Sequence, residues 1–465
     1  MNDPKNDPTR TRPIRVGLVV LLVATNLMLV LACLPEAAGQ GTPEPPGPFK
    51  LPTPTPLPPT PTPTPLPTVA PGTVAETMTR KHEFLAAEEI DGLCAAFLPA
   101  HCRLPAEYGV ETYRIWFRTR DQDGLTVEIQ ADLRFPKVAE PQTFPVFVYG
   151  AGTTGVANAC APLNEHFAGR DWGDYRTHMI SYASRGMITI LANWQGYDDS
   201  DLTHPYFVSE LEGRVMLDAA RAVYAFFEEP PAEDILAYPD TSIFLGGYSQ
   251  GGHGAFSAAR MASEYAPELD IKGVIGHAMS PDVEGLMFDS PRYSPYIVYA
   301  YRDFYGTDTV DPAEVFLPQW LGTFEEDVTS KCIDDVFEYY PNDPVQLYTP
   351  EFRSALYNDR LADEYPRFKT MLDLNDSSYK AYGSIPILLL HGADDPIVQV
   401  RTIAAFRSYL CGEGQNVTYK LYPGVNHFAT RQYGFVDTLT WMQSILNGDS
   451  PASNCLNVTT GQEGM

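Results

Sequence analysis

The chain has 465 residues, enough for a sizeable core, and 44% hydrophobic and 12% aromatic residues are typical of a globular protein rather than a disordered one. Its formal net charge of −27 disfavours nucleic acid and anionic lipid headgroups as partners. The 42 prolines are far more than such a protein usually has.

Residues 1–32 have the pattern of an export signal. A basic leader ends at Arg15, and an apolar run covers residues 16–32. The run is long for a signal-peptide core and short for a membrane span. The letters VLAC, which end at Cys33, resemble the bacterial lipobox, in which the cysteine carries a lipid. We predict a lipoprotein; a retained signal anchor and a cleaved, secreted form are the alternatives, and all three place the body outside the cytoplasmic membrane.

Residues 33–75 form a linker rich in proline and threonine, with the repeat LPTPTPLPPTPTPTPLPT. Such a segment lacks the apolar periodicity of a core and favours an extended polyproline II spacer. We expect the folded domain to cover residues 76–465.

The first predicted elements of this domain are two strands that form a hairpin. Residues 112–119 and 125–135 alternate polar and apolar side chains around the turn residues Asp123 and Gly124.

Short apolar strands then alternate with helical patterns, which predicts an α/β fold with a mostly parallel sheet covered by helices on both faces. The expected strands are 145–150, 187–194, 242–248, 271–278, 385–392 and 417–424. The expected helices are 211–227, 252–266, 401–410 and 434–446. Residues 282–383 interrupt the alternation.

The segment Gly247-Tyr248-Ser249-Gln250-Gly251 fits the pattern G-x-S-x-G between a predicted strand and a predicted helix. In this context the pattern is typical of a nucleophile elbow, a sharp turn that exposes the serine hydroxyl. The backbone N–H of Gln250 then lies near the N-terminus of the helix, where it can stabilise an oxyanion.

A catalytic serine needs a histidine base and a carboxylate that orients it. In α/β-hydrolases the chain order is serine, acid, histidine. Asp395 and Asp394 follow one predicted strand, and His427 follows the next and is the sole histidine after the acids. Asp395 fits the H-G-x-x-D-x-x-V arrangement and is the preferred acid, with Asp394 as the alternative.

A second oxyanion donor is expected after the strand 145–150. The loop there, residues 149–162, contains glycines that let the backbone approach a substrate closely. Thr153 N–H is the candidate and Gly152 N–H the alternative.

Six cysteines follow Cys33, and an even number in an exported chain favours disulfides. Proximity suggests the pairs Cys94–Cys102 and Cys411–Cys455, which leaves Cys160 with Cys332. No C-x-x-C motif occurs, so a zinc site is the weaker interpretation.

Together these segments resemble the secretory lipase family of α/β-hydrolases. The oxyanion loop of that family reads HGTTGVAxxCAPS, and residues 151–163 read AGTTGVANACAPL, with Ala151 in place of the histidine. Further similar blocks are residues 204–223 and 246–282 and the segment from Pro386 to Phe428. The resemblance implies that residues 282–383 form a cap, or lid, over the serine.

We therefore expect an exported serine hydrolase of carboxylic esters with a small-molecule or lipid ester as substrate, and the resemblance implies a lipase or esterase. The triad would be Ser249, His427 and Asp395, and the chemistry needs no metal and no organic cofactor. The N-terminal anchor would be the sole contact with a membrane. Alternative hypotheses are an esterase for acetylated or feruloylated carbohydrate or for polyester, a serine peptidase, and a non-catalytic surface binding module.

Overall fold

The structure is a computed structural model that describes residues 70–75, 78–97, 103–199, 201–378 and 380–455. The predicted signal, Cys33, most of the linker and Cys102 lie outside the described residues. At the end of the predicted linker, Gly72 N–H donates to the carbonyl of Arg118 and Ala75 N–H to that of Trp116. The chain is therefore already paired with the body before residue 76.

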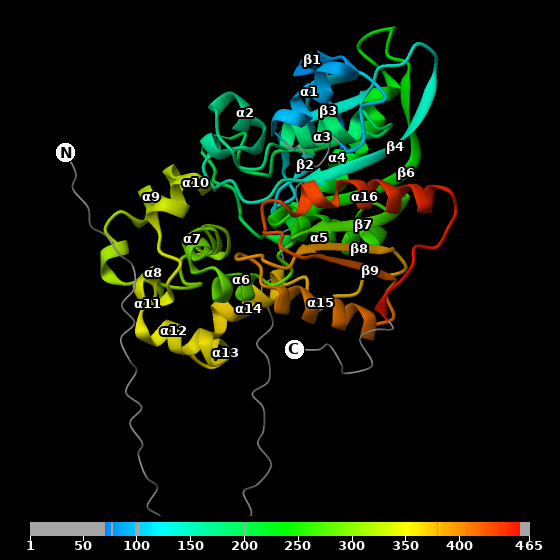
Figure 1. Cartoon of the computed structure of the whole chain (residues 1–465). Coiled ribbons are helices and arrows are strands. Elements are labelled where there is room, and N and C mark those ends of the chain that lie inside the picture. The colour runs from blue at the N-terminus through cyan, green and yellow to red at the C-terminus, as the bar shows by residue number, and fades with distance from the viewer. Residues whose placement is uncertain (1–69, 76–77, 98–102, 200, 379, 456–465) are drawn as a thin grey trace, which may run out of the picture. The chain divides into compact units, whose positions relative to one another are not determined.

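A nine-stranded sheet forms the core of the body (Figure 1). Its spatial order is β1-β2-β3-β5-β4-β6-β7-β8-β9. The pairings that involve β1, β2 and β3 are antiparallel, and those from β5 through β4 to β9 are parallel. The strands are β1 (Arg80–Leu85), β2 (Val110–Arg120), β3 (Thr126–Pro136), β4 (Gln142–Gly150), β5 (Ile188–Ala192), β6 (Ala237–Tyr248), β7 (Ile271–His277), β8 (Ile387–Gly392) and β9 (Val417–Tyr422).

The predicted hairpin is confirmed, since β2 and β3 pair antiparallel over their whole length. Gly124 in the turn has φ +75°, a left-handed conformation that glycine adopts without steric cost. The six strands predicted after the hairpin are also present. β1 was not predicted, because its sequence RKHEFL is mostly polar and it lies at the edge of the sheet.

Helices cover both faces of the sheet, as predicted. On one face, Phe244 of β6 packs against Trp441. On the same face the ring centres of Tyr182 and Phe435, which belong to different helices, lie 4.7 Å apart. The helices of this face are α3 (Tyr175–Ala183) and α16 (Thr430–Leu446). The opposite face carries α4 (Ser209–Glu228), α5 (Gln250–Tyr265) and α15 (Val400–Gly412). Shorter helices α1 (Ala87–Phe97) and α2 (Glu165–Ala168) lie early in the chain.

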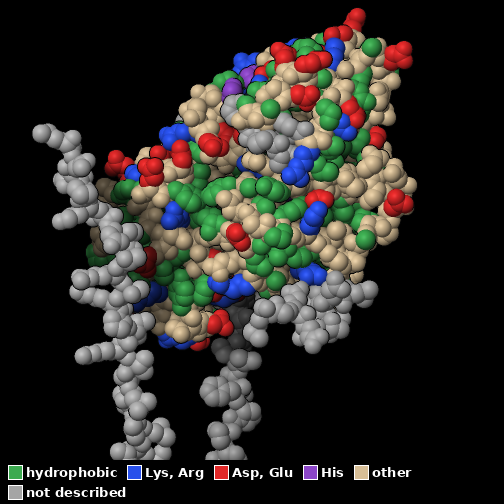
Figure 2. All heavy atoms as spheres, viewed as in Figure 1, with side chains coloured by type: hydrophobic (Ala, Val, Ile, Leu, Met, Phe, Trp, Pro, Cys, Tyr) green, Lys and Arg blue, Asp and Glu red, His purple; other side chains and the backbone are tan. Residues whose placement is uncertain are grey.

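Between β7 and β8 the chain forms a group of short helices, which we call the helical insertion (Figure 1). Its two ends meet, because Ser377 N–H donates to the carbonyl of Pro281 at 2.8 Å. The helices are α6 (Val283–Asp289), α7 (Ser294–Tyr305), α8 (Pro312–Val315), α9 (Phe324–Ser330), α10 (Ile333–Tyr339), α11 (Pro344–Leu347), α12 (Pro350–Tyr357), α13 (Leu361–Glu364) and α14 (Pro366–Asn375). Figure 2 shows hydrophobic side chains in the middle of the face seen in Figure 1, with charged side chains of both signs around them.

Two of the three predicted disulfides are present. One joins Cys160 to Cys332 of the helical insertion, and the other joins Cys411 to Cys455. Cys94 is buried, and its predicted partner Cys102 lies outside the described residues, so this pairing stays a prediction. Within the described part of the chain, no helix combines the length and apolar character needed to cross a membrane.

Candidate active site

Ser249 occupies a sharp turn between β6 and α5. Its φ is +53°, which is a strained conformation for a residue with a side chain, and the next residue begins the helix. The turn is tight because glycine lets the segments touch: a Cβ on Gly251 would lie 1.9 Å from the carbonyl oxygen of Gly150 in β4. The local geometry is that of the predicted nucleophile elbow.

Asp395 and His427 meet beyond the ends of β8 and β9. The Oδ2 atom of Asp395 lies 2.7 Å from Nδ1 of His427, and both side chains are buried. The other carboxylate oxygen accepts the backbone N–H groups of Ile397 at 2.8 Å and Val398 at 2.9 Å. Burial by itself raises the pKa of Asp395, but His427, His391 and these N–H groups outweigh it and hold the pKa below its usual range.

The two acids weighed from the sequence lie in different surroundings. Asp394 is exposed, and its backbone N–H donates to the carbonyl of Val425. The carboxylate that contacts His427 belongs to Asp395. His391 also approaches Asp395 Oδ2, at 3.6 Å, but its Nε2 atom lies 2.9 Å from the carbonyl of Val398.

Ser249 and His427 line the same cavity, which has a volume of about 280 Å³. The helical insertion closes one side of it through Tyr293 and residues of α10. The complete lining is Thr153, Asp171, Trp172, Tyr248, Ser249, Tyr293, Ile333, Asp334, Phe337, Glu338, His427 and Phe428.

A larger groove, of about 410 Å³, lies elsewhere on the body. It is lined by Pro71, Tyr224 and Leu269 among others, and it contains none of the predicted catalytic residues. Its size alone does not make it the reaction site, because it lacks a nucleophile paired with a base.

The two predicted oxyanion donors, Gln250 N–H and Thr153 N–H, belong to a residue next to Ser249 and to a residue of the cavity lining. Gln250 is the first residue of α5, so its N–H has no acceptor within the helix. Thr153 lines the cavity. Its hydroxyl lies 2.7 Å from that of Tyr206, and this hydrogen bond restricts rotation of the Thr153 side chain. The alternative donor, Gly152 N–H, already donates to Tyr175 Oη at 2.8 Å.

Residues 175–454 match the secretory lipase family. The chain belongs to the secretory lipase family. Among its relatives is Lipase A of Moesziomyces aphidis, 22% identical over 373 residues, which cover 76% of this chain and 77% of the relative.

Solved structures of other proteins share the fold of this chain. Lipase A of Candida antarctica in its closed state has a TM-score of 0.62 at 19% identity, with 83% of this chain and 85% of that chain covered. The rice cell wall degrading esterase LipA of Xanthomonas oryzae has a TM-score of 0.65 at 19% identity, with 82% and 97% covered. These likenesses establish the predicted α/β-hydrolase fold.

In this member of the secretory lipase family, a buried polar network behind the elbow was not predicted. The side-chain Nε2 of Gln250 donates to Glu212 Oε1 at 2.8 Å, and Glu212 Oε2 lies 2.6 Å from Nδ1 of His253. His253 Nε2 lies 2.6 Å from the carbonyl of Asn375, the last residue of the helical insertion's final helix. The network therefore connects the elbow to one end of the insertion.

The other partner of Gln250 is His204, whose Nε2 atom lies 2.6 Å from the amide nitrogen. Burial lowers the pKa of His204 to about 3, so the ring is neutral. Its Nδ1 atom lies 3.1 Å from the carbonyl of Gln195, so Nδ1 carries the proton and Nε2 accepts from Gln250. No local sequence pattern marks the partners of His253, which are far away along the chain.

Proposed function

We propose that this secretory lipase family member is an exported serine hydrolase that cleaves carboxylic esters. Export is implied by the family and by the signal-like N-terminus. We also propose that Cys33 carries a lipid that anchors the protein at the outer face of the cytoplasmic membrane.

In the proposed mechanism, Ser249 Oγ attacks the ester carbonyl while His427 takes its proton. The N–H groups of Gln250 and Thr153 stabilise the oxyanion of the tetrahedral intermediate. His427 then gives the proton to the leaving alcohol, and Asp395 stabilises the imidazolium throughout. Water then attacks the acyl-enzyme while His427 takes its proton. His427 returns this proton to Ser249 Oγ as the acid product leaves.

One observation carries this proposal above the others. The buried Asp395 carboxylate lies 2.7 Å from His427 Nδ1, while His427 and the elbow residue Ser249 line one cavity. A carboxylate on Nδ1 favours the tautomer whose Nε2 is free to act as a base. A histidine with only a structural role would not require a buried carboxylate on Nδ1 and a serine with a strained backbone in the same cavity.

Labelling with a fluorophosphonate probe tests the nucleophile. We expect the wild-type protein to react and Ser249→Ala to lose the label, because the probe forms a bond with an activated serine oxygen. Ser257→Ala is the matched control, since Ser257 is a buried serine of α5, the helix that follows Ser249, and does not line the cavity. Equal labelling of Ser249→Ala and the wild type would refute the assignment.

Triacylglycerol and related acyl esters are the first proposed substrate class, because the family consists of secretory lipases. Acylated carbohydrate is a second candidate, since Asp171, Asp334 and Glu338 place hydrogen-bond acceptors for hydroxyl groups on the cavity wall. The Xanthomonas oryzae relative, named as a cell wall degrading esterase, is compatible with it. Rates on p-nitrophenyl esters of increasing chain length, tributyrin and acetylated xylan separate the two: activity confined to acetyl groups would rule out the lipase.

A further inference from the structure

Helix α10 forms one wall of the cavity above Ser249. Ile333, Asp334, Phe337 and Glu338 all belong to it and all line the cavity. If this wall is held fixed, the size of the cavity limits which substrates can bind. The bonds that join α10 to the body determine whether it is held.

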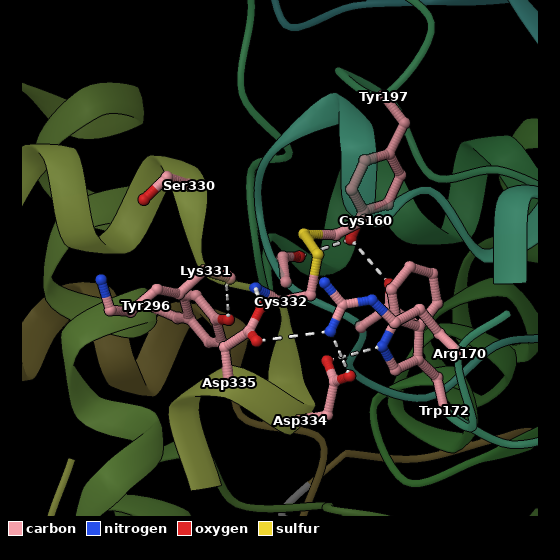
Figure 3. Close-up of a disulfide and its surroundings, with 12 residues drawn as sticks. Cys160, Arg170, Trp172, Tyr197, Tyr296, Ser330, Lys331, Cys332, Asp334 and Asp335 are labelled. Atoms are coloured by element: carbon pink, nitrogen blue, oxygen red, sulfur yellow. Dashed lines mark hydrogen bonds and ion pairs between the residues drawn. A yellow bond between two sulfur atoms is a disulfide. The ribbon is translucent and has the colours of Figure 1, made fainter. Parts of the chain in front are cut away.

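The start of α10 is bound covalently to the loop that carries the proposed oxyanion donor. Cys332, directly before the helix, forms the disulfide with Cys160 (Figure 3). Beside it, Ile333 N–H donates to the carbonyl of Thr154 at 2.9 Å. Because Thr154 follows Thr153 in the chain, this hydrogen bond fixes the position of α10 relative to the proposed donor Thr153.

Polar contacts fix the same end of α10 from a second direction. Asp334 accepts from Trp172 Nε1 at 2.9 Å and from Arg170 at 2.6 Å, and Arg170 also reaches Asp335 at 3.3 Å (Figure 3). Exposed ion pairs contribute little individually, but here they add to a covalent bond and a backbone hydrogen bond. The wall is therefore rigid relative to the loop.

Phe337, on the cavity side of α10, is held in place by its neighbours. The guanidinium of Arg292 lies 4.7 Å from its ring centre, and the same group donates to the Phe337 carbonyl at 3.1 Å. Tyr293 meets the ring edge to face at 6.0 Å. The ring also contacts that of Phe428 edge to face, with the ring centres 6.0 Å apart, and Phe428 directly follows His427.

We propose that Phe337 and Phe428 form a constriction at one side of the cavity that limits the bulk of the acyl group the enzyme accepts. The two rings touch edge to face, so no group passes between them, and the anchored wall does not move to enlarge the cavity. The pair would thus determine specificity through size. This inference rests on the proposed ester hydrolysis at Ser249.

The test compares kcat/KM for p-nitrophenyl cyclohexanecarboxylate with kcat/KM for p-nitrophenyl butyrate. We expect Phe337→Ala to raise this ratio about tenfold or more, since differences of a few methylene groups in an apolar pocket change rates by that order. Phe428→Ala should act in the same direction. Tyr339→Ala is the matched control, because Tyr339 is an aromatic residue of α10 that does not line the cavity.

Phe337→Leu, which keeps an apolar side chain in the wall, provides a variant that folds if Phe337→Ala does not, and we expect an intermediate ratio. A ratio in Phe337→Ala or Phe337→Leu that equals that of Tyr339→Ala would overturn the constriction. If the wild type hydrolyses neither ester and Ser249 takes no fluorophosphonate label, the proposed function itself fails. An active wild type with unchanged ratios removes the constriction alone.

Discussion

Ser249 has an unfavourable backbone conformation that its neighbours maintain. A non-glycine residue with φ near +53° costs on the order of 1–3 kcal/mol. Its N–H donates to the carbonyl of His277 in β7, and its carbonyl accepts the N–H groups of Gly252 and His253 in α5. These bonds explain why the hydroxyl stays in the cavity rather than relaxing into the turn.

The choice between the two neighbouring acids leads to a prediction at single residues. We expect Asp395→Asn to lower kcat by about 10⁴-fold, because the amide can donate to Nδ1 and so favours the wrong imidazole tautomer. Asp394→Asn should stay within about twofold of the wild type, as exposed substitutions usually do. Steady-state ester hydrolysis measures both.

Comparable losses in the two variants would contradict the assignment of Asp395. Circular dichroism spectra that match the wild type should accompany the measurement, so that a loss of activity can be attributed to chemistry.

The proposed catalytic residues follow from the sequence, whereas the residues that support them do not. Ser249, Asp395 and His427 follow from a motif and from chain order, and the structure brings Asp395 to His427. Glu212 and Asn375 could not be predicted, because their contacts with His253 span 41 and 122 residues and no local pattern marks them. Long-range polar contacts leave no periodic signature in a single chain.

At the scale of elements, the strands of the body can be predicted because their apolar runs correspond to strands buried on both faces of the sheet. β8, for example, is buried at every position and reads ILLLHG. The helices of the insertion were not predicted individually. Several are a single turn long, such as α8, α11 and α13, so they cannot show helical periodicity.

The start of α6, where the chain enters the insertion, contains a carboxyl with an unusual pKa. Asp282 caps the helix by accepting Gly285 N–H at 2.8 Å. Burial, followed by the negative charges of Asp376 and Glu284, raises its pKa to about 7, while Lys369 opposes the shift. In an unfolded chain an aspartate has a pKa of about 3.9.

This shift predicts a pH-dependent stability. A pKa raised by folding means that the stabilising contribution of protonated Asp282 is complete below about pH 4 and is lost as the pH rises through about 7. We expect Asp282→Asn, which keeps a capping side chain, to remove this decline, so its Tm relative to wild type should rise from pH 4 to pH 8. Thermal melts across that range provide the measurement.

Asp311→Asn is the control, because Asp311 also caps a helix but is exposed. Parallel pH profiles for the wild type and Asp282→Asn would show that this carboxyl does not titrate as described.

At the scale of the whole molecule, two disulfides join distant parts of the chain with different consequences. Cys160–Cys332 spans 172 residues and reaches the cavity wall, whereas Cys411–Cys455 spans 44 residues and joins α15 to the C-terminal segment. Proximity in the sequence predicts the second pair, and the first followed from it only by elimination. The spacing of two cysteines this far apart in the sequence does not predict whether they pair.

Replacing each pair by serines separates stability from selectivity. On chain entropy alone, loss of the longer link should cost about 1 kcal/mol more in unfolding free energy than loss of the shorter one. Only the variant without Cys160 and Cys332 should also accept bulkier esters, because only it removes the covalent bond that anchors α10. Denaturant unfolding and the two p-nitrophenyl esters provide the measurements, and a relaxed selectivity in the variant without Cys411 and Cys455 would contradict this division.

The hydrogen bond between Ser377 and Pro281 has a consequence for how this fold can vary. Because the insertion leaves the body almost where it enters, its length and sequence can change without altering the spacing of β7 and β8. The proposed catalytic residues Ser249, Asp395 and His427 lie on loops of the body, outside this segment. Residues 282–376 thus form an exchangeable cassette, through which one hydrolytic centre can acquire different substrates by replacement of a single segment.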